Sequence, residues 1–598
     1  MENYTASGWD WQGKTLTDFS ANYALQIPGS SGIIEAPSRG MRWSTAAGNT
    51  AAKGDEWIMR GVHSAVDDIR RGVFKEVALL AYEGGDLSRV NMIPYQMIKG
   101  EVAHHRSDVF LERAIIKERL RLALGMNMQP PEDQLPISAT IHEMEEMGES
   151  GSKKHFEKPL VNIIPFACNA CPPKQIRITD SCQGCISHPC MNVCPKNAIY
   201  LDERKHCHID QSKCIKCGKC FNQCPYRAIS KIERPCAAAC GMDAIGSDEL
   251  GRAKINYDKC VNCGMCLVNC PFGAIADKSQ IYQTVRAIAR GEEVIAIVAP
   301  AFVGQFGKEA TPGKIQAAMK VLGFADVVEV AIGADLCTVQ EAHAFLEEVP
   351  AKMPWMGTSC CPAWSKMAKT LFPQQAEYVS MALTPMVITA RMVKLLYPDS
   401  KVVFVGPCAA KKAEANRRTI RSDVDFVLTF EEMQGIFDAK EIDFTKIQED
   451  PEEKMENGTG FGRGFAVSGG VAAAVAETIS HLDPGREVKI EKAEGLRDCR
   501  KMLLMAKTGK RDGYLLEGMA CPGGCVAGAG TIQPVSVGAM NVEKFKNAAA
   551  VQSCTQTPYL TSLNDVEMAH LITPPEGDAV SYPVTRLSQE ELSGTPEA

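Results

Sequence analysis

The first 167 residues of this 598-residue chain contain no cysteine. Long apolar runs are also missing, since the longest, 294–304, includes Pro300 and is shorter than the roughly 18 residues of a transmembrane helix. The first 14 residues show no basic stretch followed by an apolar one, so we expect no secretory signal. Basic charge is not in excess, because 65 Lys and Arg stand against 72 Asp and Glu. These absences predict a cytoplasmic protein with no membrane or nucleic-acid partner.

Cysteine is concentrated further along the chain. Of 25 cysteines, 17 lie between Cys168 and Cys270, and the other eight lie between Cys337 and Cys554. A reducing cytosol keeps thiols free, so clustered cysteines in such a chain indicate metal or redox chemistry rather than disulfides.

The cysteine distribution and the apolar pattern divide the chain into four regions. We expect an α+β multidomain protein with a mainly helical region of unknown role (1–160), a cysteine-dense region (161–279), an α/β region (280–540) and a C-terminal tail (541–598). In the first region His104 and His105 look like ordinary surface residues. The predicted helices are Glu56–Arg71, Arg106–Leu124, Lys314–Leu322, Thr384–Leu396 and Gly470–Ile479, and the predicted strands are Val294–Ala299, Val327–Ile332, Lys401–Val405 and Tyr514–Leu516.

A short repeat organises the cysteine-dense region. Four times a cysteine is followed by Pro or Gly, two variable residues and Ala-Ile, with another cysteine four positions earlier. This is the end of the bacterial ferredoxin run C-x2-C-x2-C-x3-C-P, in which the last cysteine binds the cluster of the other run. The four repeats begin at Cys194, Cys224, Cys240 and Cys270.

The ferredoxin rule predicts four [4Fe–4S] clusters in two nested dicluster modules. The copy at Cys240 lacks its leading pair, and we infer that Cys168 and Cys171 supply it across a long insertion. Zinc is the alternative for paired cysteines, but the repeated ending is not a zinc signature. Cys207 is left over as a bystander. The predicted sets are Cys182/Cys185/Cys190/Cys224, Cys214/Cys217/Cys220/Cys194, Cys168/Cys171/Cys236/Cys270 and Cys260/Cys263/Cys266/Cys240.

Three further cysteine motifs follow in the α/β region, where chemistry is expected at strand ends. They are Thr358-Ser-Cys-Cys-Pro-Ala-Trp364, Gly406-Pro-Cys-Ala-Ala-Lys-Lys-Ala-Glu414 and Glu517-Gly-Met-Ala-Cys-Pro-Gly-Gly-Cys-Val-Ala-Gly-Ala-Gly530. Adjacent cysteines point in different directions, so one of Cys360 and Cys361 completes a fifth cubane and the other is a free thiol available for acid–base work.

These motifs resemble the L1, L2 and L3 signatures of [FeFe]-hydrogenases, and with the ferredoxin runs the resemblance covers about 161–540. It implies a catalytic domain of two lobes with an H-cluster between them. That cofactor is a [4Fe–4S] cubane joined to a two-iron unit with CO, cyanide and azadithiolate. It also implies reversible reduction of protons to H₂, with ferredoxin as electron partner and with maturation proteins that supply the two-iron unit.

The resemblance assigns roles position by position. Cys361, Cys408, Cys521 and Cys525 match the cubane ligands, and Cys525 matches the bridge to the two-iron unit. Cys360 matches the thiol that passes protons, and Glu341 and Ser380 match the next steps of that route. Lys411 matches the lysine that hydrogen-bonds a cyanide, Met519 a methionine near the bridging CO, and Ala299-Pro300 the loop beside the distal iron. Core packing is an alternative for Met519, a solvated helix start for Lys411, and a structural carboxylate for Glu341.

This chain departs from the well-studied members. Gly406 stands where they have Met, and with Ala363 this resembles a monomeric, less-studied branch called group B. Ala344 and Glu348 replace a glutamate and an arginine of the proton route. We expect protons to leave through His343 or Glu347 instead.

Several alternatives remain at this point. A non-catalytic relative that serves in iron–sulfur assembly, or a hydrogen sensor, would share the cubane cysteines. Lys412, next to Lys411, is expected to be solvated. Cys337, Cys499 and Cys554 match no motif and are expected to be buried bystanders.

Overall fold

The computed structural model describes residues 63–84, 87–139, 158–417, 420, 422–450, 455 and 458–562. Much of the expected N-terminal region and most of the C-terminal tail lie outside these residues, as does the beginning of the predicted helix Glu56–Arg71. Within the described ranges, no helix is long and apolar enough to cross a membrane.

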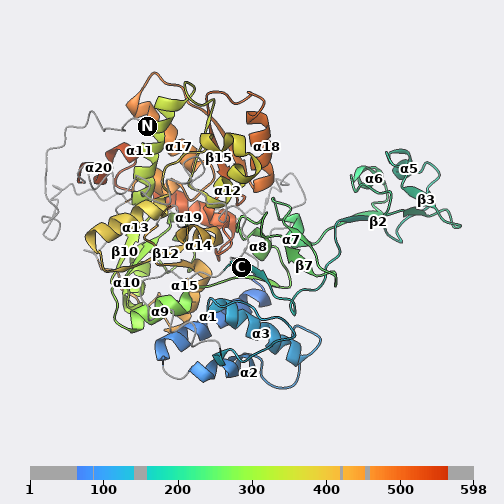
Figure 1. Cartoon of the computed structure of the whole chain (residues 1–598), viewed down its shortest axis with the longest axis horizontal. Helices are drawn as coiled ribbons and strands as arrows, with labels where there is room; N and C mark the ends of the chain where they lie inside the picture. The colour runs from blue at the N-terminus through green and yellow to red at the C-terminus, as the bar shows by residue number, and fades with distance from the viewer. Residues whose placement is uncertain are drawn as a thin grey trace, which may run out of the picture.

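The N-terminal helices (63–139) form one layer of the main body (Figure 1). Helix α1 begins after Ser64, whose side chain and that of Asp67 form a capping box, and α3 begins after Asp108, which accepts a hydrogen bond from the Leu111 amide. Both predicted helices are thereby confirmed in their described parts. The elements are α1 (Ala65–Glu83), α2 (Ile93–Met97) and α3 (Val109–Ala123).

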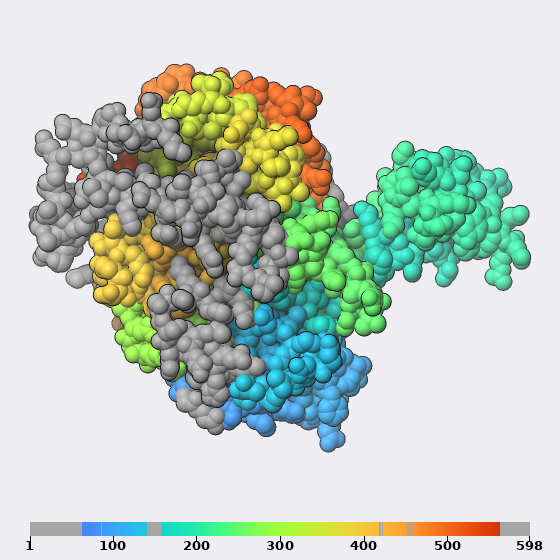
Figure 2. Space-filling model, in the orientation of Figure 1, coloured from blue at the N-terminus to red at the C-terminus, as the bar shows by residue number. Residues whose placement is uncertain are grey.

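The cysteine-dense region folds into two units that each pair short antiparallel strands. The distal module (175–232) is inserted in the sequence of the proximal module (158–173 and 234–279), yet it projects from the body while the proximal module lies against it (Figures 1 and 2). The insertion is therefore the outer unit in space. Its strands are β2 (Gln175–Ile178) with β5 (Ile229–Ile232) and β3 (Ile199–Leu201) with β4 (Cys207–Ile209), and the proximal strands are β1 (Val161–Ile163) with β8 (Ile275–Asp277) and β6 (Ile245–Ser247) with β7 (Ala253–Ile255).

Short helices carry the third cysteine of each run. Three of them begin just after a glycine or histidine in the left-handed conformation, and the fourth begins at a proline. They are α5 (Pro189–Asn192), α6 (Lys219–Gln223), α7 (Pro235–Ala238) and α8 (Met265–Val268).

The α/β region contains two separate parallel sheets. One has the order β10-β9-β12-β13 and the other β11-β15-β14. The predicted strands at Val294, Lys401 and Tyr514 are confirmed, whereas the one at Val327 is shorter because a helix already begins at Ala331. The bounds are β9 (Val294–Val298), β10 (Asp326–Glu329), β11 (Met356–Gly357), β12 (Lys401–Gly406), β13 (Phe426–Thr429), β14 (Lys489–Glu494) and β15 (Tyr514–Met519).

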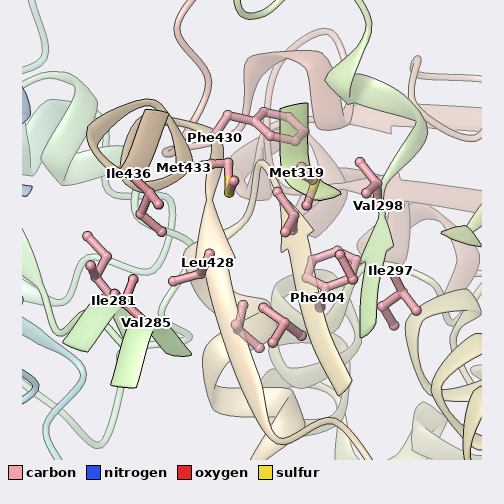
Figure 3. Close-up of a cluster of buried hydrophobic side chains, with 14 of the residues drawn as sticks. Ile281, Val285, Ile297, Val298, Met319, Phe404, Leu428, Phe430, Met433 and Ile436 are labelled. Carbon is pink, nitrogen blue, oxygen red and sulfur yellow. The ribbon is translucent and has the colours of Figure 1, made fainter. Parts of the chain in front are cut away.

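Helices cover the sheets and bury their apolar faces (Figure 3). The four-stranded sheet contacts α9 (Ile281–Ala289), α10 (Pro312–Leu322), α13 (Pro385–Leu396), α14 (Ala409–Ala415) and α15 (Phe430–Ala439). The three-stranded sheet contacts α12 (Pro362–Leu371), α17 (Gly470–Leu482) and α18 (Leu496–Ala506). Helices α11 (Ala331–Glu348), α16 (Gly460–Gly464) and α19 (Val535–Asn547) complete the body. The buried side chains labelled in Figure 3 are Ile281, Val285, Ile297, Val298, Met319, Phe404, Leu428, Phe430, Met433 and Ile436.

Candidate iron–sulfur centre

Both sheets direct the carboxyl ends of their strands to one pocket. Cys360 and Cys361 follow β11, Cys408 follows β12, and Cys521 and Cys525 follow β15. The pocket also receives the loop after β9. Nine of the residues predicted from the sequence line it together: Cys360, Cys361, Cys408, Cys521, Cys525, Lys411, Met519, Ala299 and Pro300.

The pocket has the chemistry of an iron–sulfur site with an apolar extension. Its walls include Met386, Phe404 and Phe465, and its polar groups are mainly the thiols and one lysine. Burial raises the pKa of the thiols, that of Cys408 to about 11 and that of Cys525 to about 12. A buried thiolate therefore needs adjacent positive charge, which bound iron supplies. The donor set fits an iron–sulfur cluster.

Lys411 lies at the pocket wall and is held by two partners. Its Nζ donates to Glu414 Oε2 at 2.6 Å and to Thr384 Oγ1 at 3.0 Å. Burial is the largest influence and lowers the pKa of this lysine, but the charge and hydrogen bond of Glu414 together with the charges of Cys408 and Cys360 outweigh it, so the pKa is raised. Lys411 is therefore a fixed ammonium, not a solvated helix-start lysine.

The prediction for Lys412 is wrong. This lysine is 1% exposed, and its Nζ donates to Asp277 Oδ2 and Glu432 Oε1, both at 2.7 Å. It also donates to the Lys278 carbonyl at 2.9 Å. Lys412 thus connects the end of β8 in the proximal module to α15 through a buried ion pair with two carboxylates.

Glu341 lies within α11 and is fully buried. Its Oε1 accepts from the amide and the hydroxyl of Ser359, each at 3.0 Å. Within the described ranges, no well-aligned hydrogen bond reaches Oε2. Burial raises the pKa of Glu341, and Ser359 and Ser380 only partly offset it. Glu341 therefore fixes the backbone next to Cys360 and keeps one carboxyl oxygen available, so the structural and the proton-transfer interpretations are compatible.

The geometry of α11 does not support the expected proton exit. His343 is two residues from Glu341, which is about 200° around a helix, so the two side chains leave on opposite sides. Glu347 lies one turn beyond His343 on that same side. Ala344, on a flank closer to Glu341, packs among apolar residues. The helix therefore turns His343 and Glu347 away from Glu341, and the proton exit beyond Ser380 stays a prediction.

The dicluster loops share a backbone pattern that the sequence alone does not show. In each leading C-x2-C pair the second residue after the first cysteine is left-handed: Ala170, Gly184, Lys216 and Asn262. In each repeat the third residue after the cysteine is also left-handed: Asn197, Arg227, Asp243 and Gly273. An alanine in this conformation is strained. The segment with Cys168 and Cys171 therefore adopts the same loop as the three recognisable runs.

The structure brings together each of the four predicted cysteine sets. Cys190 lies near Cys185 and Cys224, and Cys220 lies near Cys194 and Cys214. Backbone amides donate to cysteine sulfurs at equivalent places, with Ala198 to Cys194, Ala244 to Cys240 and Ala274 to Cys270, each at 3.3 Å. Such bonds favour the thiolate form. One remaining set lines a small cavity, Cys168/Cys171/Cys236/Cys270, and the other surrounds Cys263: Cys240, Cys260 and Cys266.

Within the described ranges, no three His, Cys, Asp or Glu side chains converge where they would hold one metal ion. The thiols of a cubane each bind a different iron, so they need not converge on one point. Among the sets, that of Cys263 adjoins the pocket, because Cys263 is a lining residue and lies near Cys361 and Cys521. Cys266 also lies near Cys236, so the two proximal sets and the pocket adjoin one another.

The comparisons with known proteins agree with this arrangement. Residues 292–529 match the family described as iron only hydrogenase large subunit, C-terminal domain, and residues 208–230 and 252–275 match 4Fe-4S binding domains. Iron hydrogenase 1 of Clostridium pasteurianum is 28% identical over 444 residues, which cover 65% of this chain and 76% of that protein. The chain is an [FeFe]-hydrogenase-like protein.

Other similar proteins include some that are named hydrogenases and some that are not. The NADP-reducing hydrogenase subunit HndD of Solidesulfovibrio fructosivorans is 29% identical over 46% of this chain and 56% of that protein. Protein NAR1 of Arabidopsis thaliana is 24% identical over 43% of this chain and 69% of that protein. A solved [FeFe]-hydrogenase HydA1 from Chlamydomonas reinhardtii has 20% identity and a TM-score of 0.41, with 49% of this chain and 98% of that chain covered.

Gly406 is the departure from the hydrogenase pattern that the structure explains best. A Cβ at this position would lie 2.4 Å from Cε1 of Phe404 and 3.2 Å from the Cβ of Ala299. Phe404 itself lines the pocket. The ring of Phe404 therefore occupies space that a longer side chain at position 406 would need, so the pocket is reshaped rather than enlarged.

The cysteines outside the predicted sets are buried in this hydrogenase-like chain, as expected. Cys337, Cys499 and Cys554 are fully buried, and Cys207 is 3% exposed. Cys207 is nevertheless a close neighbour of a predicted ligand, with its sulfur 3.6 Å from that of Cys190. His104 and His105 are exposed, as predicted.

Sequence reasoning missed the residues that hold the predicted ones. Glu517 begins a recognised motif, but only the structure shows that it is buried and accepts from the amides of Gly469 and Ala472 at the start of α17. Glu414 and Thr384 similarly hold Lys411. Glu414 lies three residues from Lys411, a spacing at which side chains meet on a helix, so this signal was available in the sequence.

Proposed function

We propose that this protein is a hydrogenase that catalyses 2H⁺ + 2e⁻ ⇌ H₂ with electrons relayed through four [4Fe–4S] clusters. One observation supports this most: Cys360 and Lys411 line the same apolar-walled pocket as Cys361, Cys408, Cys521 and Cys525. A cubane needs only the last four. A free thiol and a fixed ammonium beside it serve a second, reactive group in the same pocket.

That group is the H-cluster, held between the two sheets. Cys361, Cys408, Cys521 and Cys525 would bind its cubane, with Cys525 shared by the two-iron unit. When bound, the two-iron unit with its CO, cyanide and azadithiolate supplies the chemistry of making and breaking H₂. Lys411 would orient a cyanide through its positive charge, and the apolar walls would exclude water.

Protons reach this pocket through groups of the chain itself. Burial raises the pKa of the Cys360 thiol well above its usual range, so the thiol holds a proton at neutral pH. Glu341, whose Oε2 is available, would exchange that proton, and Ser380 would pass it onwards. Ser359 holds Glu341 in place for this exchange.

Electrons would enter at the distal module and end at the cubane. The distal module contains nine Lys and Arg against four Asp and Glu, a net charge of +5 in a chain whose net charge is −7. Cys217 is exposed there, together with Lys196, Lys216 and Lys219. A basic surface around an exposed cluster attracts a small acidic electron carrier, and a ferredoxin has this chemistry.

A non-catalytic iron–sulfur role is the second candidate, because the relatives include Protein NAR1 and probable cytosolic Fe–S cluster assembly factors. Such a protein needs the cubane cysteines but has no need of Cys360, Lys411 and Met519 at the same pocket. A hydrogen sensor remains a third candidate. The common arrangement of these three residues favours catalysis.

Infrared spectroscopy of protein produced with the two-iron maturation proteins tests the proposal. We expect bands from metal-bound CO and cyanide, together with H₂ production from a reduced carrier. Fully matured protein that contains its [4Fe–4S] clusters but lacks these bands would contradict the catalytic function and favour the assembly role.

The proton route has its own test. E341Q removes the exchangeable proton but keeps the volume, so we expect turnover to fall by at least tenfold with unchanged infrared bands. The matched control is E347Q, an exposed position on the opposite side of α11, which should keep normal turnover. Normal turnover in E341Q would remove Glu341 from the route.

A further inference from the structure

The N-terminal region contacts the cysteine loops of one predicted cluster. Arg119 of α3 is 6% exposed, and its guanidinium donates to the carbonyl of Gly273, three residues after Cys270. Arg106 donates to the carbonyl of Ala167, which directly precedes Cys168, and stacks 5.3 Å from the ring centre of Phe272. Two arginines from outside the cysteine-dense region therefore contact both loops of the set Cys168/Cys171/Cys236/Cys270.

Gly273 makes this approach possible. It occupies the left-handed position at which the other three repeats have Asn197, Arg227 and Asp243. A Cβ on Gly273 would lie 2.6 Å from Nη2 of Arg119. The copy of the repeat that Arg119 contacts is therefore the one with glycine, and no side chain, at this position.

No carboxylate of the described residues is in ion-pair contact with these two guanidinium groups, and Glu431 acts on Arg119 only from further away. Neither Arg106 nor Arg119 forms an ion pair with any described residue, and Nε of Arg119 is buried without an acceptor among them. Arg234 lies on the other side of the same set, 3% exposed, and donates only to neutral oxygens, including the Gly246 carbonyl at 2.9 Å. By contrast, Arg70 is paired with Glu431, and Arg121 of α3 with Glu118.

We infer that the N-terminal helices raise the reduction potential of the cluster held by Cys168, Cys171, Cys236 and Cys270, through the unpaired charges of Arg106 and Arg119. Reduction adds one electron to a cluster that already carries negative charge from its four thiolates. A fixed cation nearby stabilises the reduced form more than the oxidised form, and burial keeps this attraction from being screened. This inference rests on the proposed cluster assignment, but not on H₂ chemistry.

The inference gives the N-terminal helices a function. They carry no cysteine, and in the described ranges Arg106 and Arg119 both contact the same one of the four sets. In the proposed relay this cluster lies between the distal module and the set of Cys263. A higher reduction potential means that this cluster is reduced in preference to its neighbours and holds an electron before the final transfer.

The test is a redox titration followed by electron paramagnetic resonance, in protein that contains all its [4Fe–4S] clusters but was made without two-iron maturation. In R119Q we expect one component to shift about tenfold toward the oxidised form, or about 59 mV for a one-electron couple. R119K retains the charge and should restore most of the potential, which a purely structural role of the guanidinium would not predict. C171A, which alters only this set, identifies the component.

Two further variants complete the design. R113Q changes an arginine on the same helix that donates to the carbonyls of Ile98 and Gly100, and it should leave all potentials unchanged. G273N gives this repeat the residue of another copy and displaces Arg119, so it should lower the same potential as R119Q. Unchanged potentials in both R119Q and G273N would overturn the inference, whether or not the matured protein makes H₂.

Discussion

The distal and proximal modules have the same local structure but opposite surroundings. Each contains two pairs of short antiparallel strands, and each repeats the same left-handed positions in its cysteine loops. The distal module projects from the body (Figure 2), and Cys217 is exposed there, as are Lys196, Lys216 and Lys219. The proximal module lies against the N-terminal helices and the α/β region, with Arg119 and Lys412 buried at its borders. The same cysteine motif can therefore serve as a receiver of electrons or as a tuned internal step.

The largest expected effect concerns cluster content. C171A should lose up to four irons per protein, because Cys171 shares the loop geometry of the other C-x2-C pairs. Iron analysis gives the number of irons per protein, and absorbance at about 400 nm, where iron–sulfur clusters absorb, gives the cluster content. The matched variant C207A removes a buried thiol beside Cys190 and should keep full iron content. Equal iron content in both variants would break the proposed similarity of the two modules.

The second prediction contrasts the borders of the modules. K412M leaves Asp277 and Glu432 buried without their cation, so we expect a loss of about 3–5 kcal/mol in the free energy of unfolding. K213A in the distal module removes an exposed partner of Asp210 and should have no measurable effect. Denaturant unfolding followed by circular dichroism compares them. A stable K412M variant would show that the proximal module does not depend on this border.

The third prediction concerns the charged surface of the distal module. Replacement of Lys196, Lys216 and Lys219 by glutamate should slow reduction of the clusters by an acidic ferredoxin about ten- to a hundredfold at low salt. The rate should also lose its dependence on salt. Stopped-flow absorbance of unmatured protein measures the transfer. The same charge reversal at the exposed Lys501, Lys507 and Lys510 near the end of α18 is the control, and equal slowing there would exclude a specific docking surface.

The smallest effect is a difference in pH dependence between buried and exposed carboxyls. Burial raises the pKa of Asp335 to about 7, and hydrogen bonds from Thr459 oppose this. A folded-state pKa above the unfolded value means that stability is lost as pH rises from about 4 to about 7. The apparent Tm should therefore fall with pH over this window in the parent protein and be flatter in D335N.

A carboxyl of the distal module, that of Asp210, should change stability with pH in the opposite direction. A hydrogen bond from the Ser212 hydroxyl lowers the pKa of Asp210, so its contribution is present above the unfolded pKa and is lost as pH falls toward the folded value. D210N should leave the slope between pH 5 and 7 unchanged. If D210N altered that slope as much as D335N, burial would not be its cause.

Much of the candidate site was predictable because its chemistry is encoded in short spacings. Cys521 and Cys525 are four residues apart, and the loops of the repeats place their thiols by local backbone geometry alone. The strands before two of the three cysteine motifs were also predictable from their apolar runs, whereas β11 (Met356–Gly357) is only two residues long and was missed. The length of an apolar run indicates a buried strand. The sequence therefore predicted most of Lys401–Gly406 and the first half of Tyr514–Met519.

The wrong prediction for Lys412 concerns neighbours that are distant in sequence. Lys412 looked like a solvated lysine because its partners Asp277 and Glu432 come from other elements. Gly406 was recognised as a departure, but the sequence does not show that Phe404 lies in the space that a longer side chain would need. The proton exit beyond Ser380 stays a prediction, although the helical angle turns His343 away from Glu341.

The amino-acid sequence by itself determined which thiols are available as ligands and in which loops they lie, because a few residues of spacing and a left-handed position set that geometry locally. The tertiary structure alone decided the charge around each set. Arg119 reaches Gly273 from 154 residues away, and Lys412 reaches Asp277 from 135 residues away. Electrostatic interactions depend on distance in space and on burial, and neither is written in the spacing of a motif.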